Sequence, residues 1–159
     1  MKFSGREDVE VSIEALFEAL CDYKTFERQA MRRGADVRRV DTGETFAIGA
    51  SWNVTFVLRG RRRNMDIALK NLQAPNMMLF WAKSSGMEAS FEVELLAMSR
   101  KQTRIYVAME MYPQNLASRL LVQSLKLAKG SLNKRFKARL TEYTKTLEGR
   151  LTQRKRRFS

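Results

Sequence analysis

The spacing of apolar residues changes twice along the chain and divides it into three parts. Over residues 2–34 a short alternating stretch is followed by apolar residues at intervals of three and four, which predicts one strand and then two short helices. Ser12 and Asp22 stand where these helices begin, and Gly34 stands where the second one ends. Short side chains that accept a hydrogen bond favour helix starts and glycine favours helix ends, so the three residues mark the helix limits.

Residues 35–112 alternate apolar and polar side chains with a period of two, which is typical of strands. The alternation is clearest between Trp52 and Leu58. Turn-forming residues separate the runs at Gly43, Gly49, Pro75 and Gly86. Together with these turns, the pattern predicts six strands in an antiparallel meander.

The period returns to three and four beyond Pro113, which ends the last predicted strand. Asn115 favours a helix start, and apolar residues recur at helical spacing from Leu121 to Leu147. We expect a single amphipathic helix of about 35 residues, roughly 50 Å long at ~1.5 Å per residue. Gly130 lies inside it and predicts a bend or the close approach of another segment.

Four arginines interrupt the alternation, at Arg59 and at Arg61–Arg63. The apolar faces of the flanking strands stay in register only if Arg61–Asn64 form the turn, so we expect the arginines at a hairpin tip. Proteins that bind single-stranded nucleic acid place aromatic residues among such charges so that bases stack on them, and this run has none. The pattern therefore favours a solvated turn over a nucleic-acid contact.

Three stretches give this order of elements its local texture: VEVSIEALFEALCDYKTFE, IGASWNVTFVLRGRRRNM and NLASRLLVQSLKLAKGSLNKRF. The chain resembles, over nearly its whole length, the START-like superfamily, also called Bet v 1-like or SRPBCC, which includes polyketide cyclase/dehydrase and lipid-transport members. The resemblance rests on element order, and no catalytic motif underlies it. It implies an α+β helix-grip fold, in which a curved antiparallel sheet wraps a long C-terminal helix and a cavity between them takes an apolar ligand.

The chain of 159 residues fits one domain, which we place at residues 1–150, followed by a basic tail at residues 151–159. Residues 126–159 hold 12 Lys or Arg and two acids, and so carry +10 of the total charge of +13. This asymmetry predicts an anionic partner, such as a membrane surface, RNA or an acidic protein, although a solvated helix face would carry the same charges. The predicted contacts to an anionic surface are Arg150, Arg154, Lys155, Arg156 and Arg157.

Groups for catalysis are scarce in the sequence. There is no histidine and one cysteine, Cys21, so an internal disulfide and the usual zinc and haem ligand sets are excluded, and we expect no metal and no cofactor. The first ten residues do not fit a signal peptide, and we expect a cytoplasmic protein, at most peripheral to a membrane. Alternation predicts the outer face of the sheet for the acids of the middle strands, Asp66, Glu92, Glu94 and Glu110. This leaves Cys21 and the hydroxyls of Tyr23, Tyr112 and Tyr143, all of which fit core or rim positions better than catalysis.

The function that this reading favours is non-enzymatic binding of a hydrophobic or amphipathic, lipid-like small molecule between sheet and helix, with no catalytic residue. There are two alternatives. One is a cyclase-like or dehydratase-like enzyme, and the other is an interaction module with a collapsed cavity that contacts RNA or an acidic partner. The apolar stripe of the sheet would also serve as a plain core, whereas the nine methionines suit an adaptable pocket. The predicted lining residues are Trp52, Val54, Phe56, Ile67, Phe91, Val93, Ile105, Val107, Met109, Leu121 and Leu125.

Overall fold

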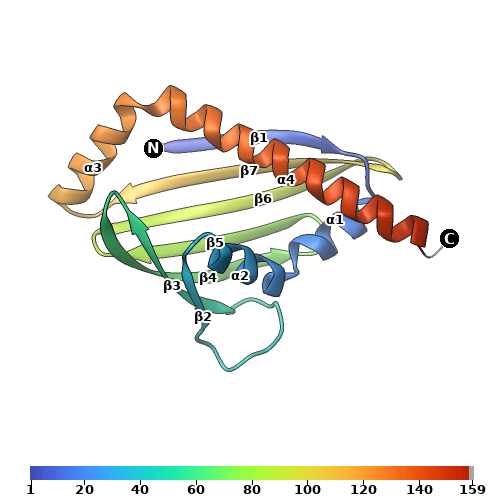
Figure 1. Ribbon diagram of the computed structural model, residues 1–159, viewed down its shortest axis with the longest axis horizontal. Coiled ribbons are helices and arrows are strands. Elements are labelled where there is room, and N and C mark those ends of the chain that lie inside the picture. The colour runs from blue at the N-terminus through green and yellow to red at the C-terminus, as the bar shows by residue number, and fades with distance from the viewer. Residues whose placement is uncertain (158–159) are drawn as a thin grey trace.

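The computed structural model describes residues 1–157, with side chains to Gln153, and shows a curved sheet with helices on one of its faces (Figure 1). The strands follow the order β1-β7-β6-β5-β4-β3-β2, and every neighbouring pair is antiparallel. The strands are β1 (Lys2–Val9), β2 (Asp36–Arg39), β3 (Ser51–Leu58), β4 (Arg61–Gln73), β5 (Met77–Ser84), β6 (Met87–Ser99) and β7 (Gln102–Pro113). The helices are α1 (Ile13–Leu20), α2 (Tyr23–Arg32), α3 (Leu116–Leu127) and α4 (Lys129–Arg157). This is the α+β helix-grip arrangement that the sequence predicts.

The two short helices after β1 begin where the capping residues place them. The Ser12 hydroxyl accepts a hydrogen bond from the Ala15 N–H at 3.2 Å, and the Asp22 carboxylate accepts one from the Thr25 N–H at 3.4 Å. Each cap satisfies an N–H group that has no partner within its own helix. Because α1 buries Leu16 and Leu20 against the sheet, it forms part of the main core.

The turn between β3 and β4 differs from the sequence prediction. It is formed by Arg59 and Gly60, which have φ angles of 52° and 74°, and Arg61–Asn64 belong to β4. Two-residue hairpin turns favour positive φ values because these match the twist of the strands. Glycine adopts such values easily, so Arg59 is the one residue of the pair for which they are unfavourable. The prediction of a turn at Arg61–Asn64 is therefore wrong, and those residues continue the strand.

The prediction of a single C-terminal helix is also wrong. Ala128 separates α3 from α4, and the two helices meet at an angle (Figure 1). The bend lets α3 pack against the end of β7 while α4 packs along β1. Gly130 lies just after the bend, and a Cβ atom built on it would meet no atom within 4 Å. Of the two roles expected for Gly130, the structure thus favours the bend over a close approach.

The interface between α4 and β1 fixes the helix to the edge of the sheet. A Cβ atom at Gly5 would lie 3.2 Å from Leu140, so glycine lets the helix approach the strand closely. The rings of Phe3 and Phe136 stack with centroids 6.2 Å apart, and Leu147 is 1% exposed within the core. Among the described residues, no helix has the length and apolar character that a membrane crossing requires.

Candidate functional site

The sheet residues that the sequence predicts to line a cavity share the face that carries the helices. Cross-strand partners point to the same side of a sheet, and Trp52 pairs with Ile67, Phe91 with Met109, and Val93 with Val107. The helices lie on that side, because Phe3, the partner of Met109 in β1, stacks on Phe136 of α4. We call this side the helix-facing face.

One half of the helix-facing face is filled by the core. It lies toward the β6–β7 hairpin, where Val93, Ile105 and Val107 are at most 6% exposed. They pack in one cluster with Leu16 of α1 and Leu147 of α4. The three predicted lining residues in this half are therefore core residues.

The other half of the helix-facing face is apolar but only partly covered. Phe91 is 37% exposed although it belongs to β6, near the middle of the sheet, and the ring of Phe80 lies 6.4 Å from it. Met109, beside Phe91, is half-buried. We define these residues and their half-buried neighbours in β3 and β4 as the open half: Val54, Phe56, Met65, Phe80, Phe91 and Met109.

The remaining predicted lining residues frame the open half. Trp52 is 6% exposed, and its ring lies among those of Tyr23, Phe46 and Phe80 at centroid distances of 6.1 to 6.4 Å. Its neighbour Ile67 is half-buried. Leu121 and Leu125 are half-buried too and lie on α3, at the end of the sheet where β7 stops.

A hollow of about 600 Å³ lies at the edge of the sheet beside β1. Gly5, Val107 and Leu140 form its apolar part, and Val107 is the predicted lining residue that reaches it. Lys2, Arg6, Lys137, Glu7, Glu92 and Glu94 supply charges of both signs. The pKa of Glu92 is raised by a hydrogen bond with Glu94, by burial and by the charge of Glu94.

A second hollow, of about 660 Å³, lies between the β3–β4 hairpin and the start of α3. Its lining is strongly basic, since Arg61, Arg62, Arg63 and Lys83 face one acid, Asp66. The volume falls within the range of ligand sites in proteins, roughly 300–1,000 Å³. The predicted lining residue that reaches it is Leu121 on α3.

Arg63 links the second hollow to the open half. It pairs across the strands with Phe56, so its side chain lies on the helix-facing side. Its Nε atom is buried and has no hydrogen-bond partner among the described residues. A buried donor without a partner is costly, and an anionic group would satisfy it. Sequence reasoning placed Arg63 in the turn and so missed this position, although a turn at Arg59-Gly60 restores the alternation that reveals it.

The acids of the middle strands face away from the helices. In β4, β6 and β7, Asp66, Glu92, Glu94 and Glu110 alternate with the residues of the helix-facing face, so the predicted orientation is confirmed. In β1, however, the sheet carries an inward carboxylate that the alternation of the middle strands did not predict. Glu7 pairs with Ile105 on the inner side, where its carboxylate accepts a hydrogen bond from the Thr141 hydroxyl of α4.

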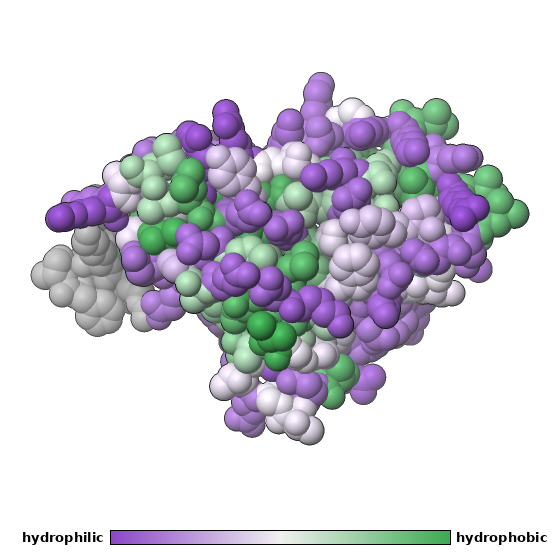
Figure 2. Space-filling model, turned by 180° about the vertical axis from the view of Figure 1, so that it is seen from behind, coloured by the Kyte–Doolittle hydropathy of each residue, from purple (hydrophilic) through white to green (hydrophobic). Residues whose placement is uncertain are grey.

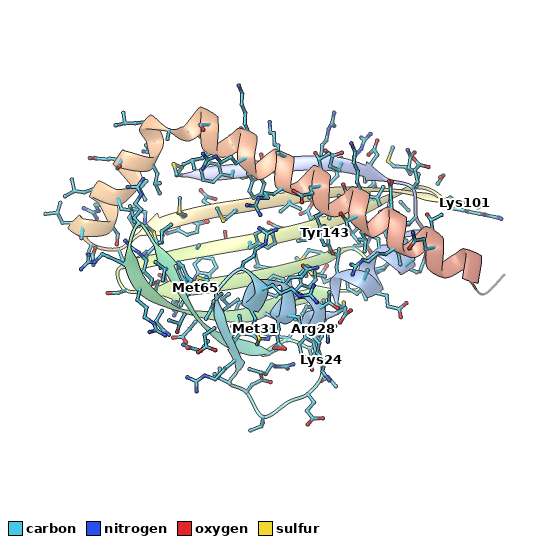
Figure 3. The ribbon with its side chains drawn as sticks, in the orientation of Figure 1. Lys24, Arg28, Met31, Met65, Lys101 and Tyr143 are labelled. Atoms are coloured by element: carbon cyan, nitrogen blue, oxygen red, sulfur yellow. The ribbon has the colours of Figure 1, made fainter. Side chains whose placement is uncertain are left out.

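Burial keeps the other candidate catalytic groups in their neutral forms. Burial and the charge of Glu18 raise the pKa of the Cys21 thiol to about 11, and thiolate is the reactive form of cysteine. Burial also raises the pKa of Tyr143 to about 12. Tyr143 projects from α4 across the sheet toward α2, where its ring lies 5.8 Å from that of Phe26 (Figure 3). It therefore closes the gap between two helices.

The other two tyrosines hold structural positions. The Tyr23 hydroxyl donates a hydrogen bond to the Glu44 carbonyl at 2.6 Å. Tyr112 lies on the outer face, where its ring stacks on Trp81 at 5.4 Å and its hydroxyl donates to Glu110 at 3.1 Å. Neither hydroxyl points freely into the open half.

Arg39 is a cation on the helix-facing face that sequence reasoning did not identify. Its guanidinium lies 4.8 Å from the ring centre of Tyr23 and 5.1 Å from that of Trp52, and Asp41 accepts its Nε–H at 2.5 Å. Hydrogen bonds from Arg39 and from the Ser51 and Gly43 N–H groups hold the pKa of Asp41 well below its usual value. The signal was present, because Arg39 follows the buried Val37 by two positions in β2.

The basic residues predicted to contact an anionic surface belong to the last part of α4. Arg150 is exposed on that helix, and its charge helps to lower the pKa of Asp22. The side chains of Arg154, Lys155, Arg156 and Arg157 lie outside the described residues. As for metals, the described part of the chain contains no group of three Cys, Asp or Glu residues placed to hold an ion.

No family model matches the sequence, and no curated protein matches it. Solved structures do match the fold. The Zhui aromatase/cyclase of a Streptomyces species superposes with a TM-score of 0.67 at 9% identity, over 95% of each chain. Norcoclaurine synthase from Thalictrum flavum superposes with a TM-score of 0.65 at 7% identity, over 96% of this chain and 86% of that one.

The structure of Ara h 8.0201 gives a TM-score of 0.59 at 15% identity, over 96% of this chain and 98% of that chain. Likeness at such low identity concerns the path of the backbone and leaves the chemistry of the site to be argued from this chain's own residues. By its sheet order, its helix positions and these superpositions, the chain has the Bet v 1-like helix-grip fold.

Proposed function

We propose that the protein binds a hydrophobic or amphipathic, lipid-like small molecule on the open half of the helix-facing face and does not change it chemically. Residues 1–150 would form the binding domain and residues 151–159 a basic extension. The observation that carries the proposal is Phe91, a large apolar residue near the middle of the sheet that is 37% exposed.

Exposed apolar surface at the middle of a sheet is unfavourable, at ~25 cal/mol per Å², and an apolar ligand that covers it recovers this free energy. The side chains around Phe91 suit such a ligand. Phe80 offers an aromatic ring at 6.4 Å, and Met65 and Met109 offer flexible thioethers that adapt to different shapes. This combination favours a binding surface that accepts a class of apolar molecules.

Arg63 supports an amphipathic ligand with an anionic group at one end. Its unpartnered Nε atom lies beside Phe56, at the border between the open half and the basic second hollow. A carboxylate or phosphate there would gain a charge-assisted hydrogen bond, while the apolar remainder lies along Phe91 and Met109.

Two carboxylates between the sheet and the helices, on β1 and α2, support binding without catalysis, because each already has a structural partner. Glu7 accepts the Thr141 hydroxyl, and Glu27 of α2 accepts the indole N–H of Trp52 at 3.2 Å. A general acid or base needs an unoccupied hydrogen-bonding position within reach of its substrate. A cyclase-like or dehydratase-like reaction would have to displace one of these contacts.

A fluorescence titration with 1-anilinonaphthalene-8-sulfonate, an amphipathic anion, tests the proposal. We expect one saturable site, with affinity reduced by about tenfold or more in Phe91→Gln, because that change places an amide in the apolar contact. Leu96→Gln is the matched control, since Leu96 lies on the same strand, faces outward and is 49% exposed. Near-UV circular dichroism verifies that both variants are folded. Equal affinities of the two variants, or no saturable site in the natural protein, would contradict the proposal.

The ligand class can be read from the purified protein itself. Organic extraction of protein held under native conditions, followed by mass spectrometry, should recover one lipid or isoprenoid class from the natural chain and less of it from Phe91→Gln. Equal recovery from Phe91→Gln and from Leu96→Gln would place the ligand elsewhere.

A further inference from the structure

The helix α3 carries apolar residues on two opposite sides. Ser118, Val122 and the half-buried Leu125 face the sheet. On the other side, Leu116, Leu120 and Leu127 are 71%, 56% and 92% exposed. At 3.6 residues per turn these three leucines lie within about 40° of one another around the helix axis, so they form one stripe.

The tip of the β3–β4 hairpin extends this apolar surface. The Arg59 guanidinium lies 3.5 Å from the Ser124 hydroxyl of α3, which places the tip against the helix. Val57 and Leu58, next to Arg59, are 69% and 43% exposed. We call the leucine stripe together with this tip the α3 face. Figure 2 shows green side chains beside purple ones at the right-hand end of the molecule, where α3 lies in that view.

The chain segments that form the α3 face carry basic residues and no acid. Between Glu110 and Glu142 the chain has seven basic residues and no acid: Arg119, Lys126, Lys129, Lys134, Arg135, Lys137 and Arg139. The hairpin adds Arg59, Arg61, Arg62 and Arg63, and residues 45–65 contain no acid. An exposed leucine stripe on a basic segment complements a surface that is anionic outside and apolar beneath.

We propose that the α3 face docks on an anionic lipid bilayer, with Leu116, Leu120 and Leu127 inserted below the headgroups and the surrounding Arg and Lys residues at the level of the phosphates. Amphipathic helices bind membrane interfaces by this combination of buried apolar area and attraction to anionic lipids. The basic second hollow lies beside α3 on the side that faces the sheet, so it adds positive charge behind the docked surface. The proposal differs from a contact through Arg150 and the end of α4, which lies at the opposite end of the molecule (Figure 1). It holds whether or not the open half binds a small molecule.

Co-sedimentation with vesicles tests the proposal on the full chain. We expect binding to phosphatidylglycerol vesicles at low salt, weak binding to phosphatidylcholine vesicles, and a decline as salt screens the charges. The triple variant Leu116→Gln, Leu120→Gln, Leu127→Gln should lose affinity for phosphatidylglycerol vesicles by about tenfold or more. Glutamine is as good a helix former as most straight-chain residues, so α3 is retained. The matched control is Ile48→Gln, Leu96→Gln, which removes two exposed apolar residues outside the α3 face and should bind like the natural chain.

A chain ending at Gly149 separates the α3 face from the C-terminal charges. We expect the truncated chain to bind vesicles and to lose that binding when the three leucines are replaced. Binding that depends on the C-terminal residues and not on the leucines would overturn the proposal, as would absence of binding at low salt. Leucine-independent binding to RNA in a separate filter-binding assay, with no binding to vesicles, would assign the charges to nucleic acid and would also overturn it. Phe91→Gln should leave vesicle binding unchanged, so failure of the docking proposal is distinguishable from failure of the binding proposal.

Discussion

Trp52 contacts residues from several parts of the fold. It is buried between the sheet and α2, its indole N–H donates to Glu27 at 3.2 Å, and the Arg39 guanidinium lies over its ring. The residues around it belong to α2, β2, β5 and the loop before β3. Its removal therefore affects packing, a hydrogen bond and a cation–π contact together.

We predict that Trp52→Ala lowers the free energy of unfolding by ~3–5 kcal/mol, because it opens a cavity in the core. Arg62→Ala should change it by less than ~0.5 kcal/mol, since Arg62 is exposed at the hairpin. Urea denaturation followed by circular dichroism measures both. If Arg62→Ala proves the more damaging of the two, the assigned orientation of β3 and β4 is wrong.

At the scale of elements, two glycines lie near opposite ends of α3 in different surroundings. Gly86 in the β5–β6 turn has a φ of 70°, and its carbonyl accepts the Gln114 N–H at 2.8 Å. A Cβ atom there would lie 2.1 Å from the side chain of Asn115, which caps α3 by accepting the Ser118 N–H at 2.9 Å. Gly130, just after the bend, has open space around it.

Alanine at these two glycines should have opposite effects. Gly86→Ala is expected to lower the free energy of unfolding by ~1–3 kcal/mol, because alanine would be strained at this positive φ and would displace the Asn115 cap. Gly130→Ala is expected to stabilise the protein by ~0.5–1 kcal/mol, because alanine is the better helix former and meets no clash. Thermal melts of both variants against the natural chain provide the test. Destabilisation by Gly130→Ala would show that the bend needs glycine there.

The elements that the sequence predicts correctly are those with a strict local rule. Alternation over β3 to β7 and the caps at Ser12, Asp22 and Asn115 depend only on neighbouring residues. The bend at Ala128 depends on where β7 ends and where β1 lies, and Gly130 predicted either a bend or a close approach without deciding between them. The exposed side of α3 was missed for the same reason, because leucines on both sides of a helix read as one broad apolar pattern until the sheet is in place.

The candidate site shows the same limit. Alternation correctly separates Phe91 and Met109 from Glu92 and Glu110 across the two faces of the sheet. It does not show that Val93 and Val107 are filled core while Phe91 is partly exposed, because this depends on where α1 and α4 pack. Alternation in the middle strands carries no information about the side on which Glu7 of β1 lies.

At the scale of the whole molecule, charge is concentrated on one part of the chain. Residues 126–159 carry 12 bases and two acids, and the ion pairs of the described side chains lie elsewhere, at Arg39–Asp41, Lys83–Glu88 and Arg104–Asp8. Like charges such as Arg135 and Arg139 are four residues apart on α4, a spacing that destabilises a helix by ~0.2–0.5 kcal/mol per pair. The folded state therefore contains net repulsion along α4.

Salt should stabilise this protein by screening that repulsion. Raising sodium chloride from about 10 mM to about 150 mM reduces the range of the repulsion to ~8 Å. We expect the free energy of unfolding to rise by about 1 kcal/mol, which corresponds to a rise of roughly 2–4 °C in Tm. Differential scanning calorimetry at constant pH measures the shift. A Tm that falls over this range would mean that ion pairs contribute more to stability than the repulsion costs.

The pairing of β1 with β7 affects how the protein folds during its synthesis on the ribosome. Lys2 pairs with Glu110 and Val9 with Thr103, so the first strand to be synthesised has its partner about 100 residues later. At ~5–20 residues per second, β1 waits roughly 5–20 s while the meander from β2 to β6 is already being made. During that interval the apolar side chains of β1 remain without their partner strand, which is the situation in which strands of neighbouring nascent chains pair wrongly. The pairing of β1 is therefore a late and vulnerable step of folding, and a chaperone that covers β1 until residue 113 has emerged would protect the chain.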